Sequence, residues 1–267
     1  MAKLDSILIF DLIGKMAHFR KFYTNSSSLS YHIPPRSTIS GTIAAIMGLE
    51  KDSYYDLLSP KHSRIAISLR TPTRSIMQTV NSLLTTTLQN LSGYGYRTQI
   101  PTEIVVPEDG TSNLKYRVFF WHDQFSIMED LGARLKGGKS SYPISLGTAS
   151  MISKALFVDW PRIENIKIMQ PADHDVDVVT PCPVEAINFK EMKGKNRSIR
   201  YIKDIMPFAF GDNRSLTKNI DFVYEKGGAP MPVRLNMPYV NVIYATANEV
   251  LSENLFFSED YYLGEKN

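Results

Sequence analysis

The sequence contains almost no cysteine and no long hydrophobic run. Among 267 residues there is one cysteine, Cys182, which stands between two prolines and cannot form an internal disulfide or a metal cluster alone, so we expect it to be a small filler residue. The apolar run near the start, Ile7–Phe10, ends at Asp11 and falls far short of the roughly 20 residues that span a bilayer. These absences predict neither a signal peptide nor a membrane anchor, and they favour a reducing cytoplasm as the location.

Several motifs of enzymes and metal sites are also missing. The sequence has no GxGxxG or GxxxxGK[ST] nucleotide-binding loop, no HExxH and no spaced set of Cys and His. The acidic stretch Asp173–Asp177 lacks the glycine and the terminal glutamate of an EF-hand loop, so a solvated acidic turn is favoured over a metal site. We therefore expect no metal and no cofactor, and a small-molecule enzyme has no motif in its support.

Charge is distributed unevenly along the chain. Residues 1–160 hold 17 Lys and Arg against 12 Asp and Glu, whereas residues 161–267 hold 13 against 15. Within the first part, the windows 12–49, 57–102 and 131–158 contain no acidic residue. Such windows suit a polyanionic partner, because a carboxylate near a phosphate would offset a nearby cation. A mildly basic surface with chance spacing is the alternative, and charge alone does not choose between them.

Hydrophobic patterns in the first 160 residues predict a two-layer domain. Short apolar runs or alternations predict strands at 4–10, 65–69, 114–120 and 151–158, and residues 15–35 are expected to form a loop. Helical periodicity follows Pro34-Pro35 and ends near Gly48, and a second helical pattern runs from Phe125 to Leu135 before Gly137-Gly138. The order strand, helix, strand, strand, helix, strand is the ferredoxin-like arrangement, which RNA recognition modules share. The RNP1 signature of those modules is absent, so the fold alone does not specify RNA.

An insert of about 44 residues, Arg70 to Asn113, separates the second and third predicted strands, where a plain hairpin needs 2–5 residues. Its content of β-branched and aromatic residues, including Thr85–Thr87 and Gly93–Tyr96, favours an ordered projecting hairpin. Residues 161–267 are punctuated by prolines and predict a β-rich subdomain. The expected fold is therefore α+β, with a ferredoxin-like domain over 1–160, an insertion at about 70–113 and a β-rich part over 161–267.

The segment Tyr31–Gly41 holds the strongest local signal for a binding site. Arg36, Ser37 and Thr38 stand at a predicted helix start, where free N–H groups and the helix dipole attract phosphate, and Gly41 would allow a backbone to approach. An ordinary N-cap with a solvated arginine is the alternative reading.

A metal-independent ribonuclease is a second possibility in the same region. It would need a general base, a general acid and a cation beside the phosphorane. His18, Tyr23, Tyr31, His32 and Arg36 are close in sequence and include these groups. The simpler hypothesis is that His18 and Tyr23 stack on RNA or hydrogen-bond to it without cleaving it.

Four segments resemble one known family. Asp11–Ser28 and Pro34–Gly48 are similar to the fifth CRISPR-associated protein family, the RAMP subunit of type I Cascade complexes, and closest to its type I-B branch. Arg97-Thr98-Gln99 with Glu103 resembles that family's return from its projecting hairpin, and Tyr142–Gly147 resembles its Tyr-Pro…Leu-Gly loop. The resemblance covers roughly residues 4–160 and is only general beyond them.

This resemblance implies an RRM-like RAMP domain that carries a β-hairpin thumb. It implies a subunit that binds and caps the 5′ handle of the guide RNA (crRNA), packs against the Cascade backbone subunit and large subunit, and meets target DNA only through the complex during antiviral targeting. The residues expected to bind RNA are His18, Arg20, Lys21, Tyr23, Arg36, Ser37, Thr38, Gly41, Arg70, Arg74, Arg97, Gln99, Lys136, Lys139 and Gly147.

Type I-C members of the family are endoribonucleases with a Tyr/Lys/His set. Here the third predicted strand ends in Phe119–His122 without an adjacent Lys-His pair, and type I-B systems assign processing of the precursor to a separate ribonuclease. We therefore predict a binding subunit without catalytic residues, with endoribonuclease processing of precursor crRNA as the alternative.

Overall fold

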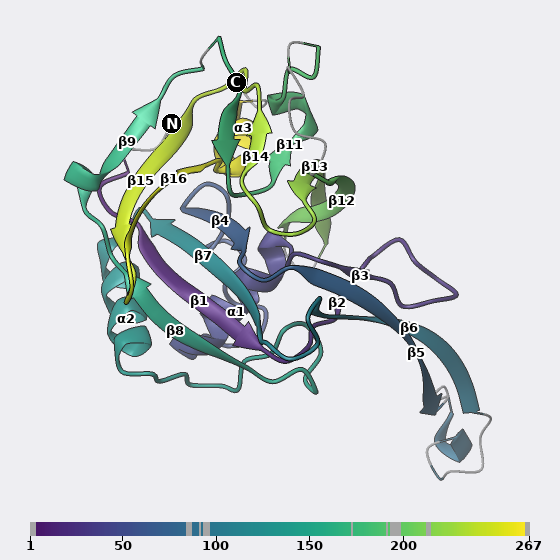
Figure 1. Cartoon of the computed structure of the whole chain (residues 1–267). Coiled ribbons are helices and arrows are strands. Elements are labelled where there is room, and N and C mark those ends of the chain that lie inside the picture. The colour runs from purple at the N-terminus through teal and green to yellow at the C-terminus, as the bar shows by residue number, and fades with distance from the viewer. Residues whose placement is uncertain are drawn as a thin grey trace.

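A four-stranded antiparallel sheet forms the centre of the N-terminal part in the computed structural model (Figure 1). Its strand order is β4-β7-β1-β8, in which β1 pairs with both β7 and β8, and β7 also pairs with β4. β1 and β4 are thus parallel but separated by β7, which is the split βαβ arrangement expected. The strands are β1 (Leu8–Gly14), β4 (Ser63–Leu69), β7 (Leu114–His122) and β8 (Ser153–Asp159). The structure describes residues 4–83, 87–90, 92, 97–171, 173–190, 192, 199–211 and 215–264.

Both long helices cover one face of this sheet, and both predicted helices are confirmed. α1 (Arg36–Met47) begins after Pro35, whose backbone is extended, and it ends at Gly48 with φ +80°, a left-handed conformation that glycine adopts at low cost. α2 (Phe125–Lys136) ends at Gly137. Alternate residues of β1 point toward these helices, and Leu8, Phe10 and Leu12 belong to the main core with the apolar side of α1.

The opposite face of the sheet is covered in part by a five-stranded sheet from the C-terminal part. Ile9 and Phe119 pack there with Val240 and Val242 in a second apolar core. A three-stranded sheet and the short helix α3 complete this part, so the prediction of a β-rich C-terminal region is confirmed. The elements are β9 (Ile166–Met169), β10 (Val176–Val178), β14 (Met231–Val233), β15 (Tyr239–Ala245) and β16 (Val250–Leu255) in the first sheet, β11 (Cys182–Pro183), β12 (Tyr201–Phe210) and β13 (Leu216–Glu225) in the second, with η2 (Ile163–Asn165), η3 (Val184–Ala186) and α3 (Ser258–Gly264).

The long insert forms a two-stranded hairpin, which we call the arm (residues 73–107). Its strands β5 (Thr73–Leu83) and β6 (Arg97–Pro107) pair antiparallel along their whole length and project away from the rest of the chain (Figure 1). The projecting hairpin is therefore confirmed, whereas the Gly93–Tyr96 stretch lies outside the described residues.

One local prediction was wrong. The loop predicted over 15–35 contains a pair of short strands, β2 (Phe19–Arg20) and β3 (Ser30–Tyr31). We call residues 15–31 the hook. The first predicted strand, an apolar run over residues 4–10 expected to end near Gly14, is β1, and Arg117 on the neighbouring strand holds the Asp11 carboxylate with two hydrogen bonds of 2.7 and 2.8 Å.

The mixed α+β class is confirmed, while the boundary between 1–160 and 161–267 stays a prediction. Cys182 is fully buried, and burial raises the pKa of its thiol, which agrees with a filler residue. Among the described residues, no helix is long and apolar enough to cross a membrane.

Candidate nucleic-acid interface

The hook is attached to the outer edge of the arm. Ala17 and Val105 exchange two backbone hydrogen bonds of 2.9 Å, and Ser28 pairs with β6 further toward the arm's tip, accepting from the Glu103 N–H at 2.9 Å. His18 joins the two segments, because its Nδ1 lies 2.6 Å from the carbonyl oxygen of Glu103 and its Nε2 lies 2.8 Å from the Ser28 hydroxyl. The His18 ring, which we predicted to touch RNA, is buried in this joint.

The arm exposes large apolar side chains along its length. Met77 and Leu83 are 57% and 56% exposed, and Leu88 near the tip is 86% exposed. The hook adds two exposed rings, Phe22 and Tyr23, which meet edge to face at 5.3 Å between centroids. Apolar surface of this kind marks an interaction site, because a hairpin of two strands has no core of its own. Sequence reasoning missed Phe22, although its place in Arg20-Lys21-Phe22-Tyr23 is a basic segment interleaved with aromatic residues.

The predicted cations of the arm and hook differ in their surroundings. Arg20 and Arg74 are exposed, as is Gln99 on β6, and Arg97 lies on β6 opposite Leu83. Lys21 is instead half-buried.

The Lys21 ammonium lies 2.5 Å from an Asp204 carboxylate oxygen, and the other Asp204 oxygen accepts a 2.8 Å hydrogen bond from the Tyr23 hydroxyl. Burial alone would lower the pKa of Lys21, but the hydrogen bond and charge of Asp204 raise it. Lys21 therefore fastens the hook to β12.

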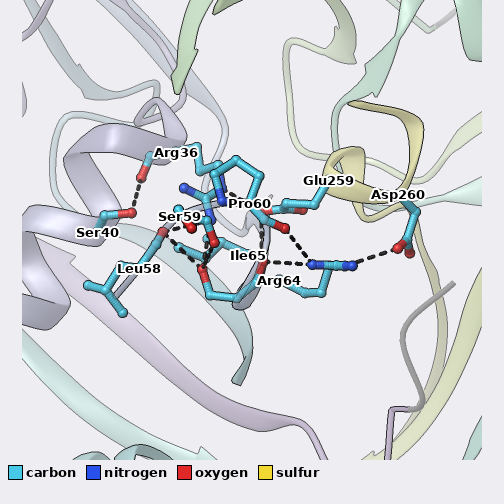
Figure 2. A network of polar contacts seen from close by, with 10 residues as sticks. Arg36, Ser40, Leu58, Ser59, Pro60, Arg64, Ile65, Glu259 and Asp260 are labelled. Atoms are coloured by element: carbon cyan, nitrogen blue, oxygen red, sulfur yellow. Dashed lines mark hydrogen bonds and ion pairs between the residues drawn. The ribbon is translucent and has the colours of Figure 1, made fainter. Parts of the chain in front are cut away.

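Arg36 lies inside the protein at the start of α1 (Figure 2). Its Nε lies 2.5 Å from the Glu259 carboxylate of α3, and its Nη2 donates to the Leu58 carbonyl at 2.9 Å and to the Ser63 hydroxyl at 2.7 Å. The same Glu259 oxygen accepts the N–H of Ile65 at 3.0 Å. Arg36, predicted to meet a phosphate, is thus enclosed and paired with a carboxylate.

Burial dominates the electrostatics of this pair. It lowers the pKa of the Arg36 guanidinium and raises the pKa of the Glu259 carboxyl, and the attraction between the two groups opposes both shifts. The second Glu259 oxygen has no hydrogen-bond partner among the described residues. Beside this pair, Arg64 binds Asp260 of the same helix at 3.0 Å (Figure 2), so α3 fastens α1 to β4.

Arg70, at the root of the arm, is held in a similar way. Its guanidinium makes two hydrogen bonds of 2.6 and 2.5 Å to Glu253 and one of 3.1 Å to the Tyr244 hydroxyl. Burial would raise the pKa of Glu253, but its contacts with Arg70 lower it. Four cations of the acid-poor N-terminal part therefore meet carboxylates of the C-terminal part, in the pairs Lys21–Asp204, Arg36–Glu259, Arg64–Asp260 and Arg70–Glu253.

The other predicted residues at the helix start are half-buried. Pro35 occupies the N-cap of α1 and no side chain caps the helix, so neither Ser37 nor Thr38 is the N-cap. Ser37 lines a small groove with the rings of Tyr54 and Tyr55, and a Cβ at Gly41 would lie 3.2 Å from the Tyr54 hydroxyl.

The last three predicted residues, Lys136, Lys139 and Gly147, lie on or after α2 and not on the arm. Lys136 on α2 stacks its ammonium 5.0 Å over the Phe157 ring, and Lys139 is exposed just beyond this helix. Gly147 has φ +99°, and a Cβ there would overlap the carbonyl of His18. Gly147 is therefore required for close packing of its loop on the hook.

The groups considered for a ribonuclease make structural contacts with other parts of the fold. The His122 Nε2 lies 2.8 Å from the Leu57 carbonyl oxygen, and its Nδ1 accepts the N–H of Gln124 at 2.9 Å. His32 lies 2.9 Å from the Thr73 hydroxyl, and the Tyr31 hydroxyl donates to the Ile205 carbonyl at 2.7 Å. Within the described ranges, no group of three or more His, Cys, Asp or Glu residues could hold a metal ion.

Comparison with solved structures finds likenesses at low identity. A CRISPR RNA-guided surveillance complex includes a chain that is 15% identical, with 85% of this chain and 91% of that chain covered and a TM-score of 0.45. A CRISPR protein from Archaeoglobus fulgidus is 12% identical, with coverages of 93% and 99% and a TM-score of 0.47. A chain of the Type III-B Cmr-beta complex bound to cognate target RNA and AMPPnP is 12% identical, with 86% of each chain covered and a TM-score of 0.48.

Comparison by sequence gives a family match. Among curated proteins no match is found. The family model described as CRISPR-associated protein (Cas_Cas5) matches residues 7–107, a range that includes β1, the hook, α1, β4 and the arm. The match does not address the type I-B subtype, which stays a prediction. Over residues 7–107, the chain is similar to the CRISPR-associated Cas5 family.

Proposed function

We propose that this chain is a subunit of a CRISPR effector complex that binds the 5′ handle of the guide RNA with its arm and hook. The family match over residues 7–107 supports the proposal, because that range contains both segments. The observation that carries it is an ordered hairpin that projects from the domain with large apolar side chains exposed. Its partners would be the guide RNA and the backbone and large subunits of the complex, with target DNA reached through that complex in the cytoplasm.

The chemistry of the hook suits single-stranded RNA. Phe22 and Tyr23 offer exposed ring faces and edges on which unpaired bases can stack, and Arg20 next to them can bind a phosphate. Arg74 and Gln99 extend the polar surface onto the arm. Arg36 is not part of this proposal, because its guanidinium is enclosed and bound to Glu259.

Binding to a labelled RNA tests the proposal. The probe is a fluorescent RNA with the repeat sequence of the cognate CRISPR array, and the competitor is the same RNA with its sequence shuffled. Phe22→Ala should weaken binding about tenfold or more, since stacking of one base contributes roughly 1–3 kcal/mol. Arg20→Ala with Arg74→Ala should reduce the slope of log affinity against log salt by about 0.7 for each phosphate that the variant no longer neutralises.

Lys167→Ala is the matched control, because Lys167 is an exposed cation on β9, outside the arm and hook. It should leave affinity and salt slope unchanged. Equal binding of the shuffled RNA would refute the proposal. So would full affinity in both Phe22→Ala and the double variant of Arg20 and Arg74. Cleavage of the repeat RNA at one position in EDTA, lost in Tyr23→Phe, would instead support the endoribonuclease alternative.

A further inference from the structure

The outer edge of β8 is a free edge of the central sheet. β8 pairs with β1 on one side and is the last strand in the sheet order. On its other side, the Ser153 N–H donates to the Ile144 carbonyl at 3.0 Å, so the preceding loop covers only the start of the strand. From Lys154 to Asp159, no strand in the described part of the chain pairs with this edge. Unpaired main-chain groups of this kind can accept another strand.

One face of β8 is exposed. The register places Lys154 opposite Ile13 of β1, on the face of the sheet that points away from α1 and α2. Leu156 lies two residues further on the same face and is 48% exposed, and Ile152 before the strand is 75% exposed. The other face of β8 packs against the main core through Ala155. An edge strand with exposed aliphatic side chains is unusual for a surface that stays in contact with solvent, because such an edge can pair with a strand of another chain.

This face is open because the C-terminal sheet covers only part of the central sheet. That sheet ends at the turn between β15 and β16, at residues 246–249, and a cleft separates the turn from the central sheet. The cleft is lined by Ile13, Lys115, Leu156, Asn248, Glu249 and Leu251, among others. We call Ile13, Lys115, Ile152, Lys154 and Leu156 the β8 surface.

The β8 surface carries two lysines in one row of the sheet. Lys115 and Lys154 lie on either side of Ile13, two strand spacings or about 10 Å apart. Neither has an ion-pair partner among the residues that the structure describes. Asp11 binds Arg117 and Glu253 binds Arg70, so these two carboxylates are neutralised. Two further carboxylates line the cleft, Glu249 on the turn and Asp159, which accepts the N–H of Ala245 at 2.7 Å. The β8 surface itself carries two positive charges and no carboxylate.

We propose that the β8 surface binds an extended acidic segment of a partner protein as an added strand. Main-chain hydrogen bonds to the free edge would give affinity, while acidic side chains meet Lys115 and Lys154 and apolar ones meet Ile152 and Leu156. A second copy of this chain fits less well, because it would bring the same lysines. A nucleic acid fits less well, because the exposed side chains here are aliphatic and offer no ring for stacking. The inference goes beyond the proposed function, which concerns the arm and hook.

Synthetic peptides test this proposal with the whole chain. The probe is a blocked eight-residue peptide in which valine and threonine alternate with glutamate, and its partner has lysine at every glutamate position. Fluorescence anisotropy should show at least tenfold tighter binding of the acidic peptide. Lys154→Glu should remove this preference, because it leaves one positive and one negative charge on the β8 surface, whereas Lys167→Glu on β9 should leave it unchanged. Methylation of alternate backbone nitrogens in the acidic peptide should abolish binding, because a strand would lose its main-chain donors.

Several outcomes would overturn the inference. Equal binding of both peptides, or an unchanged preference in Lys154→Glu, would remove the role of charge. No binding of the acidic peptide up to about 1 mM would remove the site. Concentration-dependent dimers that Leu156→Glu dissolves would assign the edge to a second copy. Loss of repeat-RNA binding in Lys154→Glu, with Lys167→Glu unaffected, would assign it to RNA; a failure confined to the hook variants would bear only on the proposed function.

Discussion

The arm and the start of α1 have similar basic sequences but opposite surroundings. Arg74 of the arm is exposed beside exposed apolar side chains, and Arg20 of the hook is exposed beside two rings. Arg36 of α1 is enclosed and bound to Glu259 of α3, at the other end of the chain. The first region leaves its charge exposed, whereas the second uses its charge to hold the fold together.

The difference shows that an acid-free window in sequence is not an acid-free surface. The windows 12–49 and 57–102 contain no carboxylate, yet their cations include Lys21, Arg36, Arg64 and Arg70, each of which meets a carboxylate from the C-terminal part. The acidic excess of residues 161–267 supplies these partners. The uneven charge along the chain is therefore satisfied in part within the molecule, and the cations available to a partner are those that the fold leaves exposed.

The largest effect is expected where the buried pair is broken. Glu259→Gln should lower the free energy of unfolding by about 3–5 kcal/mol, because it leaves the Arg36 guanidinium buried without a counter-charge. Urea denaturation followed by circular dichroism measures this change. A loss below about 1 kcal/mol would mean that the pair contributes no more than an exposed one.

A double variant separates the internal role of Arg36 from a role in RNA binding. Arg36→Met with Glu259→Leu removes both charges together and should recover most of the lost stability, because a buried ion pair can often be replaced by apolar side chains. The folded double variant should bind repeat RNA as the wild type does. A loss of affinity in this variant, with its stability recovered, would return Arg36 to the RNA site and erase the contrast with the arm.

Replacing the outer arm should have a smaller effect on stability and a clear one on binding. A short Gly/Ser linker in place of residues 78–100 keeps the pairing of Ser28 with β6. It should change stability by less than about 1 kcal/mol, because most of the removed side chains that the structure describes are exposed. Affinity for repeat RNA should fall at least tenfold, or about 1.4 kcal/mol, in the same anisotropy assay. Ile152→Ser, at an exposed aliphatic side chain on the β8 surface, is the control and should bind normally. A collapse of stability on replacement would make the arm part of the core.

Local signals explain the parts of the fold that the sequence predicts correctly. α1 and α2 were found because proline and glycine mark their ends and apolar residues recur at helical spacing. The four central strands and the arm follow from alternation and from the length of the insert. Several predicted site residues are exposed as an interface requires, among them Arg20, Tyr23, Arg74 and Gln99.

The parts that were missed depend on contacts between distant residues. The two short strands of the hook are held by Ala17 and Ser28 on β6, about eighty residues away in sequence. Arg36 meets a partner 223 residues away, and no local pattern near either residue predicts that pair. The exposure of the Phe22 ring could likewise not be predicted from the sequence, because an aromatic residue in a polar loop can pack inward or outward with equal ease.

The smallest effect concerns the ion pair at the arm's root, which is less deeply buried than the pair at α1. The contacts with Arg70 lower the pKa of the Glu253 carboxyl below its ordinary value of 4.5, so this pair contributes stability above that pH and loses it as the pH falls through the lowered value. The free energy of unfolding of wild type should therefore fall between about pH 5 and pH 3, and Glu253→Gln should fall less steeply over that window. Glu249→Gln, which changes an exposed carboxylate on the neighbouring turn, should reproduce the wild-type slope.

A slope in Glu253→Gln equal to that of wild type would mean that Arg70 gives Glu253 no more stabilisation in the folded protein than water gives it in the unfolded chain. Arg70 could then leave Glu253 at little cost in free energy and bind RNA. The root of the arm would in that case resemble the exposed arm and hook, and not the buried pair at the start of α1.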